Sequence, residues 1–209
     1  MRAMRAMRPT RSITGLCAGV AAGLALAAGT AGADVPSYPQ VEVRTTEGSF
    51  VLELNGKRAP LTVAHFLALV EADFYDGLVF HRIVPDFVIQ GGGYTPKYEL
   101  KEPDNTIPNE SGNGLSNERG TIAMARTGDP HSANTQFFVN LVDNGPKLDP
   151  QPERWGYAVF GSVIYGMDVV DAIGSTPTAA GGPFPAEVPT MPVIIEDVIY
   201  HPSGYTPPE

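Results

Sequence analysis

The sequence predicts a mainly β domain, built as an antiparallel barrel or sandwich with helices at its ends. Three observations lead to this fold class: many short apolar segments of strand length, two separated segments with helical spacing, and turns rich in glycine and proline, of which the chain has 23 and 20. A chain of 209 residues, 43% of them hydrophobic, is long enough for one well-filled core and short for two. We therefore expect one folded domain.

The first two strands are predicted to form a hairpin. Val41, Val43 and Thr45 alternate with charged residues, which is typical of a strand with one buried face. A turn over residues 46–49 then leads into an apolar return segment, residues 50–54. These segments predict two antiparallel strands.

Two segments carry helix signals. The first begins at Pro60, which suits the first turn of a helix. Its apolar residues recur at the spacing i, i+3, i+4 and i+7: Val63, Phe66, Leu67 and Val70. This apolar stripe is expected to cover a sheet. A second, shorter helix is predicted over residues 167–173, where Gly174 stops it.

The other predicted strands are apolar runs between turn residues. They cover residues 78–84, 87–90, 121–125, 136–141, 157–163 and 193–200. The segment from Tyr94 to Arg119 is long and polar, and loops of that length in a small domain tend to be functional or mobile. Pro-rich segments, residues 34–40 and 202–209, predict flexible ends around a domain of residues 41–201.

The N-terminus has the pattern of a secretory signal peptide. Four arginines precede an apolar run over residues 15–28: Arg2, Arg5, Arg8 and Arg11. Small residues follow the run and predict cleavage after Ala33. A membrane anchor is the alternative, but the run is shorter than the ~20 apolar residues that a spanning helix needs. We expect export to the periplasm, or secretion if the source has no outer membrane, without stable membrane association.

Charge and cysteine content exclude several classes of function. Cys17, the only cysteine, lies inside the predicted signal peptide, so the mature chain would have neither a disulfide nor a thiol catalyst. Loss of residues 1–33 removes 4 of the 14 basic residues and none of the 23 acidic ones, which changes the formal charge from −9 to −13. So acidic a surface disfavours nucleic acid and anionic membranes as partners.

The histidines do not predict a metal site. His65, His81, His131 and His201 are scattered without the close pairing of zinc ligands, and we expect structural roles for them. Three glycines at residues 91–93 do not precede a helix, so they predict a bulge or a close approach of backbones rather than a phosphate site. Neither pattern predicts a metal ion or another cofactor.

An arginine among apolar residues is the most informative feature of the chain. In an extended strand Phe80, Arg82 and Val84 would share one face, which places a cation beside aromatic and aliphatic side chains. A charge in such surroundings needs a partner or a task. A salt bridge, or an arginine at the rim of a barrel, is one interpretation, and a functional arginine is the other.

Several separate blocks resemble the cyclophilins, a family of peptidyl-prolyl cis/trans isomerases. Residues 80–92 (FHRIVPDFVIQGG) resemble the family signature, residues 133–138 (ANTQFF) its second half, and residues 157–161 (YAVFG) a late strand. Residues 120–126 (GTIAMAR) are especially similar to the periplasmic proteobacterial branch. The resemblance runs from about residue 41 to residue 200. It implies a closed eight-stranded antiparallel barrel capped by two α-helices, and a monomeric enzyme without a cofactor.

The resemblance also implies the site residues. The catalytic positions are Arg82, Phe87, Gln90 and Phe138, and the substrate-binding positions are Val88, Ala125, Arg126, Gln136, Leu148 and Tyr157. Arg82 would donate a hydrogen bond to the proline nitrogen of a twisting bond, while apolar side chains hold the ring. Without the resemblance, ordinary core packing is the alternative for Phe87, Phe138 and Leu148.

One block departs from the family pattern. The family usually has Trp or Phe just before the leucine, where this chain has Lys147 before Leu148, and one extra residue is inserted nearby. Because that aromatic residue forms much of the cyclosporin contact in sensitive members, we predict weak inhibition by cyclosporin. Trp155 follows shortly after, and the sequence leaves open whether it refills the gap.

The function predicted from these residues is rotation of Xaa-Pro bonds in exported proteins. The substrates would be Pro-containing polypeptides that are unfolded or partly folded. A chaperone or binding module that holds such segments without turnover is the first alternative. A barrel that carries a small apolar ligand is the second, and the internal charge disfavours it.

Overall fold

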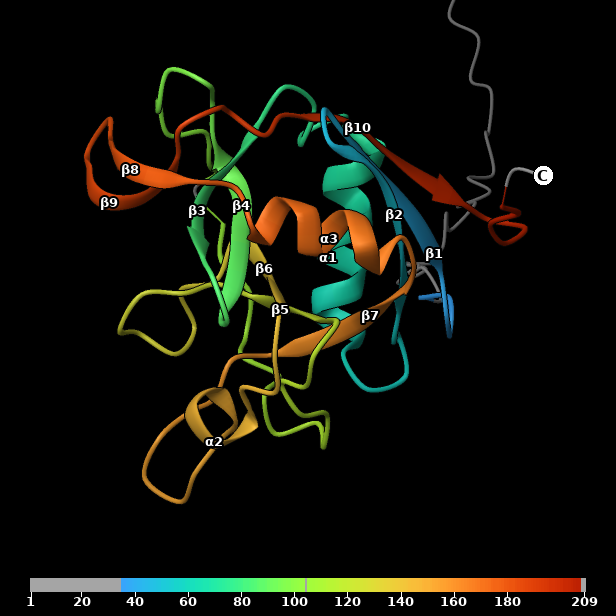
Figure 1. Ribbon diagram of the computed structural model, residues 1–209. Helices are drawn as coiled ribbons and strands as arrows, with labels where there is room; N and C mark the ends of the chain where they lie inside the picture. Colours follow the sequence, from blue (N-terminus) through green and yellow to red (C-terminus); the bar gives the residue numbers. More distant parts are fainter. Residues whose placement is uncertain (1–34, 104, 208–209) are drawn as a thin grey trace, which may run out of the picture. The chain divides into compact units, whose positions relative to one another are not determined.

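Antiparallel strands form one closed barrel in the computed structural model, which describes residues 35–103 and 105–207 (Figure 1). The eight strands, in chain order, are β1 (Gln40–Thr45), β2 (Gly48–Leu54), β3 (Val79–Val84), β4 (Val88–Tyr94), β5 (Thr121–Met124), β6 (Phe137–Asn140), β7 (Val159–Tyr165) and β10 (Ile195–His201). Their order around the sheet is β10-β1-β2-β7-β5-β6-β4-β3. The predicted signal peptide, with Cys17, lies outside the described residues.

The barrel closes between β3 and the start of β10. The N–H of Phe80 donates to the carbonyl of Val193 at 3.0 Å, and the N–H of Ile195 donates to the carbonyl of Leu78 at 2.7 Å. These bonds satisfy the backbone groups that an open sheet would leave at its edges. The predicted eight-stranded closed barrel is therefore confirmed.

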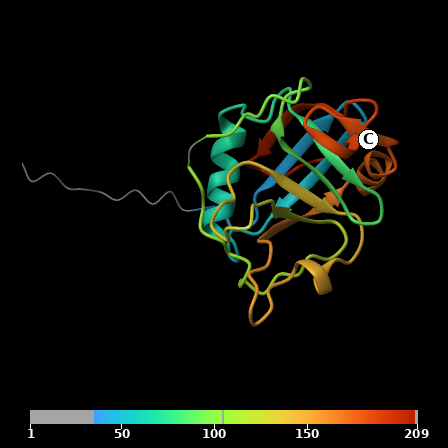
Figure 2. The same cartoon turned by 90° about the vertical axis from the view of Figure 1, so that its left-hand side faces the viewer.

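Two helices cover the ends of the barrel, as predicted. Helices α1 (Pro60–Glu71) and α3 (Met167–Gly174) overlap in Figure 1 and lie on opposite sides in the view turned by 90° (Figure 2). The predicted apolar stripe of α1 is buried. A third helix, α2 (Gly145–Leu148), is a single turn, too short for an apolar period to predict.

The interior of the barrel is filled by a cluster of aromatic side chains. Phe66 of α1 lies 5.2 Å from Tyr75, 5.8 Å from Phe137 and 5.3 Å from Phe160 between ring centroids. All four of these residues have no exposed surface. Helix α1 is thus held to the barrel by its buried face. At its start, the Glu110 carboxylate also accepts hydrogen bonds from the N–H groups of Leu61 and Thr62.

A second apolar cluster lies on the outer face of the barrel wall. Its buried members are Val88, Ala123, Phe138 and Val159. Neighbouring residues in a strand point to opposite faces, so Phe137 enters the interior and Phe138 the outer cluster. The second cluster therefore offers an apolar surface that the barrel core does not use.

A β-bulge changes the predicted faces of β3. Phe80 pairs with Gly91 and Arg82 pairs with Gln90, so His81 is an extra residue between two successive pairs. Phe80 consequently joins the interior cluster, while Arg82 lies on the other face with Val84. The prediction that Phe80 and Arg82 share one face was wrong, because simple alternation does not hold across a bulge.

A separate hairpin packs against β3. Strands β8 (Thr178–Gly181) and β9 (Phe184–Pro189) form a two-stranded sheet that the sequence analysis did not predict. Phe184 lies 5.4 Å from the His81 ring and 5.1 Å from the Tyr94 ring. In the view of Figure 1 this hairpin extends from the barrel beside β3 and β4.

Both predicted flexible ends make contacts with the barrel. The N–H of Gly56 donates to the carbonyl of Ser37 at 3.0 Å, and the N–H of Tyr205 donates to Oε1 of Gln40 at 2.8 Å. Flexibility of these ends remains a prediction. Among the described residues, no helix combines the length and the apolar character needed to cross a membrane.

Candidate active site

The predicted site residues meet in a small cavity on the outer wall of the barrel. The cavity has a volume of about 110 Å³ and is lined by Arg82, Phe87, Val88, Gln90, Ala125, Arg126, Phe138, Leu148 and Tyr157. Gln136, the remaining predicted residue, lines an adjoining cavity of about 440 Å³ that shares Gln90, Ala125 and Arg126. The two cavities adjoin through these shared residues and together bring all of the predicted site residues into one region.

The apolar wall of the small cavity is the outer cluster of the barrel. Phe138 of β6 is nearly buried and meets the Tyr157 ring edge to face, with 5.6 Å between the centroids. Val88 comes from the adjacent strand β4, and Leu148 from helix α2. The placement of Phe138 and Val88 follows directly from the alternation of strands β6 and β4.

The polar side of the site is a chain of side-chain hydrogen bonds. Arg82 Nη1 lies 3.4 Å from Oε1 of Gln90, whose Nε2 donates to Oε1 of Gln136 at 3.1 Å. Gly93 gives Gln136 its room, because a Cβ at Gly93 would lie 2.5 Å from the Gln136 side chain. The predicted bulge at the three glycines is confirmed by the pairing of β3 with β4, which shifts register between the pairs Val79–Tyr94 and Phe80–Gly91.

Arg82 is also held by a residue that the sequence analysis missed. Its Nε donates to Oε2 of Glu187 in β9 at 2.7 Å, and the side chain of Arg82 is 34% exposed. No sequence signal could have found this partner, since 105 positions separate the two residues. The interpretation of Arg82 as an ion-paired arginine is therefore confirmed, whereas its functional role remains a prediction.

Arg126 ties the cavity to the loop that precedes β7. Its Nη2 donates to the carbonyl of Trp155 at 2.8 Å and its Nε to that of Gly156 at 3.3 Å, while its guanidinium lies 4.5 Å from the Tyr157 ring centroid. These contacts hold the Arg126 side chain at the rim of the cavity.

Trp155 does not refill the gap left by the missing aromatic residue. Trp155 is 49% exposed, its ring packs against His131 with 5.2 Å between the centroids, and it does not line the small cavity. Lys147 lies in its place, with Nζ 5.6 Å from the Phe87 ring centroid. Lys147 thus lies beside Phe87 of the cavity wall but does not line the small cavity itself.

A buried network of amides supports the cavity from below. Asn144 donates through Nδ2 to the carbonyl of Phe87 and to Oδ1 of Asn140, both at 2.9 Å. Asn140 in turn donates to Oδ1 of Asn117 at 3.3 Å, and all three asparagines are buried. The sequence analysis missed this network, although asparagine at the end of an apolar strand is a signal that a buried polar group needs partners.

Asp149 completes that network beneath Leu148. Its carboxylate accepts hydrogen bonds from the Ser116 hydroxyl and from the backbone N–H and the amide of Asn117. Burial alone would raise the pKa of Asp149, but these hydrogen bonds to the charged form outweigh burial and lower the pKa below its ordinary value. The carboxylate is therefore held in its charged form, and its hydrogen bonds hold the end of α2 in position.

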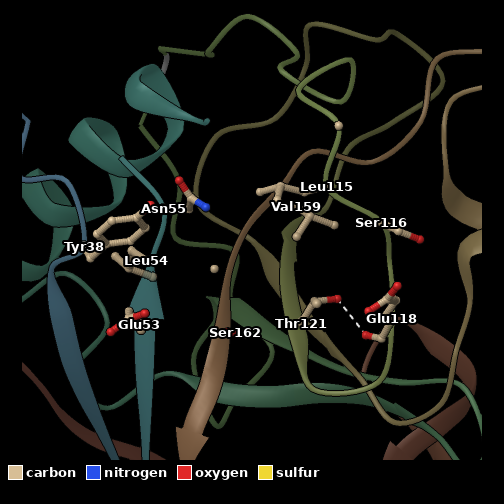
Figure 3. Close-up of a pocket in the computed structure, with 12 residues that line it drawn as sticks. Tyr38, Glu53, Leu54, Asn55, Leu115, Ser116, Glu118, Thr121, Val159 and Ser162 are labelled. Atoms are coloured by element: carbon tan, nitrogen blue, oxygen red, sulfur yellow. Dashed lines mark hydrogen bonds between the residues drawn. The ribbon is translucent and has the colours of Figure 1, made fainter. Parts of the chain in front are cut away.

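A larger cavity lies elsewhere on the barrel and lacks this chemistry. It has a volume of about 310 Å³ and lies between β2, β7 and the segment before β5 (Figure 3). Its charged lining residues are Glu53 and Glu118, and Thr121 donates to the carbonyl of Glu118 at 2.7 Å. Because it joins no cation to an apolar wall, we place the candidate active site at the smaller cavity.

The fold and the site define a class of protein: a closed antiparallel barrel whose outer wall carries an arginine beside a pocket for one apolar side chain. The family model described as cyclophilin type peptidyl-prolyl cis-trans isomerase/CLD matches residues 40–199. The chain belongs to this family of enzymes, whose reaction class is isomerisation. Resemblance to the periplasmic proteobacterial branch remains a prediction.

Curated relatives span nearly the same domain. Peptidyl-prolyl cis-trans isomerase cyp18 of Streptomyces antibioticus is 51% identical over 158 residues, which cover 75% of this chain and 95% of that protein. Peptidyl-prolyl cis-trans isomerase B of Escherichia coli (strain K12) is 44% identical over 164 residues, covering 76% and 97%.

Solved structures show the same fold. A cyclophilin type peptidyl-prolyl cis-trans isomerase of Cryptosporidium parvum superposes with a TM-score of 0.63 and 24% identity, over 80% of this chain and 99% of that one. Another structure of the same protein, in the presence of the dipeptide Ala-Pro, superposes with a TM-score of 0.61 over 78% of this chain and 98% of that one.

Proposed function

We propose that this isomerase accelerates Xaa-Pro bond rotation in exported proteins, with Arg82 as its central catalytic residue. Rotation of the peptide bond faces a barrier of ~18–20 kcal/mol because resonance gives the C–N bond double-bond character. The cis and trans forms before proline differ by only ~0.5–1 kcal/mol. The reaction therefore needs no nucleophile, only a site that binds the twisted amide more tightly than the planar one.

Arg82 supplies a group that distinguishes the twisted amide from the planar one. Rotation makes the proline nitrogen pyramidal and localises its lone pair, which a guanidinium N–H can then bind. Glu187 occupies Nε of Arg82 and Gln90 lies near Nη1, whereas Nη2 has no hydrogen-bond partner among the described residues. The observation that carries the proposal is the position of this guanidinium beside the apolar cavity.

The rest of the cavity would hold the substrate while one side of the bond rotates. Phe138, Leu148 and Val88 offer the proline ring an apolar wall. Gln90 and Gln136 present amide groups along the adjoining cavity, where a peptide backbone can pair with them. Binding of Pro-containing segments is supported by the Ala-Pro dipeptide named for the Cryptosporidium parvum relative.

Nuclear magnetic resonance exchange spectroscopy tests the proposal directly. The purified protein and its Arg82→Ala variant are compared for cis/trans exchange of an Ala-Pro test peptide. Arg44→Ala is the control, because Arg44 also pairs with carboxylates, Glu42 and Asp197, outside the candidate site. We expect exchange to collapse only in Arg82→Ala, with all three proteins folded.

Two other results would contradict the proposal. Unchanged exchange in Arg82→Ala would remove Arg82 from catalysis. Peptide binding by the wild type without faster exchange would favour the alternative of a chaperone that holds Pro-containing segments.

The exported context is part of the proposal and is supported by the N-terminal sequence. Four arginines, an apolar run and small residues before Asp34 form the pattern of a cleaved signal peptide. Cell fractionation followed by N-terminal sequencing tests it: we expect an extracytoplasmic protein that begins near Asp34. A cytoplasmic protein that retains Met1 would contradict it.

A further inference from the structure

The β8–β9 hairpin contacts both Arg82 and the residue before it, His81. The carboxylate of Glu187 accepts a hydrogen bond from Arg82 Nε at 2.7 Å. The ring of His81, the residue just before Arg82, stacks at 5.4 Å on Phe184 of the same hairpin. The hairpin therefore contacts two successive residues of β3 at the point where the bulge turns Arg82 toward the cavity.

The backbone at Glu187 has an unusual conformation. Its φ is +67°, in the left-handed region that a long side chain rarely adopts. The pairing of β8 with β9 is irregular in the same stretch, between Ala179 and Gly181. A backbone conformation of this kind persists only where the surrounding contacts stabilise it. Such residues are often found at functional sites.

Buried contacts hold the hairpin in this position. Val188, directly after Glu187, is buried, and Phe184 packs edge to face on Tyr94 at 5.1 Å. A carboxylate on an anchored strand is a better restraint than one on a free loop, because its own position is already determined. Glu187 can thus orient Arg82 at little further cost in entropy.

We propose that Glu187 is a positioning residue for Arg82, and that the β8–β9 hairpin is a structural part of the active site. A carboxylate on Nε restricts the rotation of the guanidinium and leaves its outer N–H groups directed to Gln90 and the cavity. Without this restraint, the Arg82 side chain would lose its rotamer freedom at the moment when the twisted amide binds, and this loss of entropy would oppose binding. The inference rests on the proposed catalytic role of Arg82.

The first experiment compares Glu187→Gln with a matched control. Asp171→Asn is that control, because Asp171 pairs with Arg119 at the same 2.7 Å and is exposed to a similar extent, 46% against 43% for Glu187. The rate of cis/trans exchange of the Ala-Pro peptide is measured at limiting and at saturating peptide concentrations. We expect about a tenfold loss of kcat in Glu187→Gln, as for other residues that orient a functional group, with KM nearly unchanged. Asp171→Asn is expected to match the wild type.

A second readout follows Arg82 itself. The Nε–H proton of Arg82 is observed by nuclear magnetic resonance in the wild type and in Glu187→Gln, with Arg82→Ala used to assign it. We expect this proton to exchange faster with water in Glu187→Gln, while the urea unfolding midpoint changes as little as in Asp171→Asn. A general loosening of the fold would instead move the midpoint.

The outcomes separate this inference from the proposed function. If Arg82→Ala keeps its exchange activity, the proposed function fails. If Arg82→Ala is inactive but Glu187→Gln stays within twofold of wild type, or loses affinity rather than kcat, the positioning role of Glu187 is overturned. An Nε–H proton that exchanges equally fast in both proteins would overturn it as well.

Discussion

The surroundings of Arg82 are set by one β-bulge and two hydrogen-bond partners. The bulge at His81 turns Arg82 to the outer face of the barrel, and Glu187 and Gln90 then hold two of its nitrogen atoms. A guanidinium can satisfy both partners and still donate to a third, because it carries five N–H groups in one plane. An ion-paired arginine can therefore remain able to bind a substrate.

Phe137 and Phe138 form a natural pair for a test at the residue scale. Phe137 lies in the barrel interior against Phe66 and Phe80, whereas Phe138 lies in the small outer cluster that lines the cavity. We expect Phe137→Ala to cost about 3–5 kcal/mol of unfolding free energy, the usual range for a buried phenylalanine. Phe138→Ala should cost less stability and raise KM for the peptide at least about tenfold, since a lost apolar contact in a pocket is worth about 1–3 kcal/mol.

Urea unfolding of both variants, together with the rate at which each accelerates cis/trans exchange of the Ala-Pro peptide, checks this prediction. Equal losses of stability, with no change in KM for Phe138→Ala, would show that both rings only pack the core.

Lys147 carries a prediction about inhibition. The lysine lies over the edge of Phe87, where the family usually has an aromatic residue, and Trp155 packs elsewhere. We expect weak inhibition by cyclosporin and stronger inhibition of Lys147→Trp, because the indole restores an apolar contact surface. Inhibition of peptide exchange is the measurement, and nanomolar inhibition of the wild type would contradict the prediction.

At the scale of elements, short helix α2 depends on a carboxylate beneath it. Asp149 accepts three hydrogen bonds from Ser116 and Asn117, and these bonds connect the end of α2 to the segment before β5. A four-residue helix has too few hydrogen bonds to be stable alone, so its position depends on such contacts. The position of Leu148 in the cavity wall therefore depends on Asp149.

Asp149→Asn should weaken this connection. We expect a loss of about 1–3 kcal/mol at pH 7, the usual cost when a buried polar group loses its partners, together with weaker peptide binding. Because the pKa of Asp149 is lowered in the folded protein, its contribution is present above pH 3.8, the ordinary value, and is lost as the pH falls through the folded pKa. Urea midpoints of wild type and variant should differ at pH 7 and converge once the pH falls below the folded pKa of Asp149, which is lower than 3.8. A constant difference would exclude the ionised carboxylate as the cause.

At the scale of the whole molecule, His81 makes stability depend on pH. Burial, with a smaller effect of the neighbouring Arg82 charge, lowers the pKa of His81 from 6.5 to about 4. The unfolded chain therefore takes up a proton below pH 6.5 that the folded protein resists until about pH 4. The unfolding free energy should fall as the pH falls through this window, by at most about 3 kcal/mol.

Urea unfolding at pH 7 and pH 4.5 measures this dependence, with His81→Phe as the comparison. The phenyl ring retains the stacking on Phe184 but cannot be protonated. We expect a shallower pH dependence in His81→Phe. Equal slopes would assign the effect to other groups.

The sequence by itself determined the local elements and most of the candidate site. Period-two alternation predicted the first strand, and apolar runs between turn residues predicted most of the others. The spacing of Val63, Phe66 and Val70 predicted α1, because such patterns follow from backbone geometry over a few residues. The residues quoted for the family resemblance, such as Arg82 and Phe138, also meet in one cavity.

Only the tertiary structure decided which side chains complete that cavity. The bulge at His81 reversed the expected face of Phe80, and the β8–β9 hairpin brought Glu187 to an arginine 105 positions away. The position of Trp155 and the amide network around Asn140 were likewise visible only in three dimensions. The physical reason is that bulges, ion pairs and buried polar networks depend on contacts between distant segments, which no local period in the sequence records.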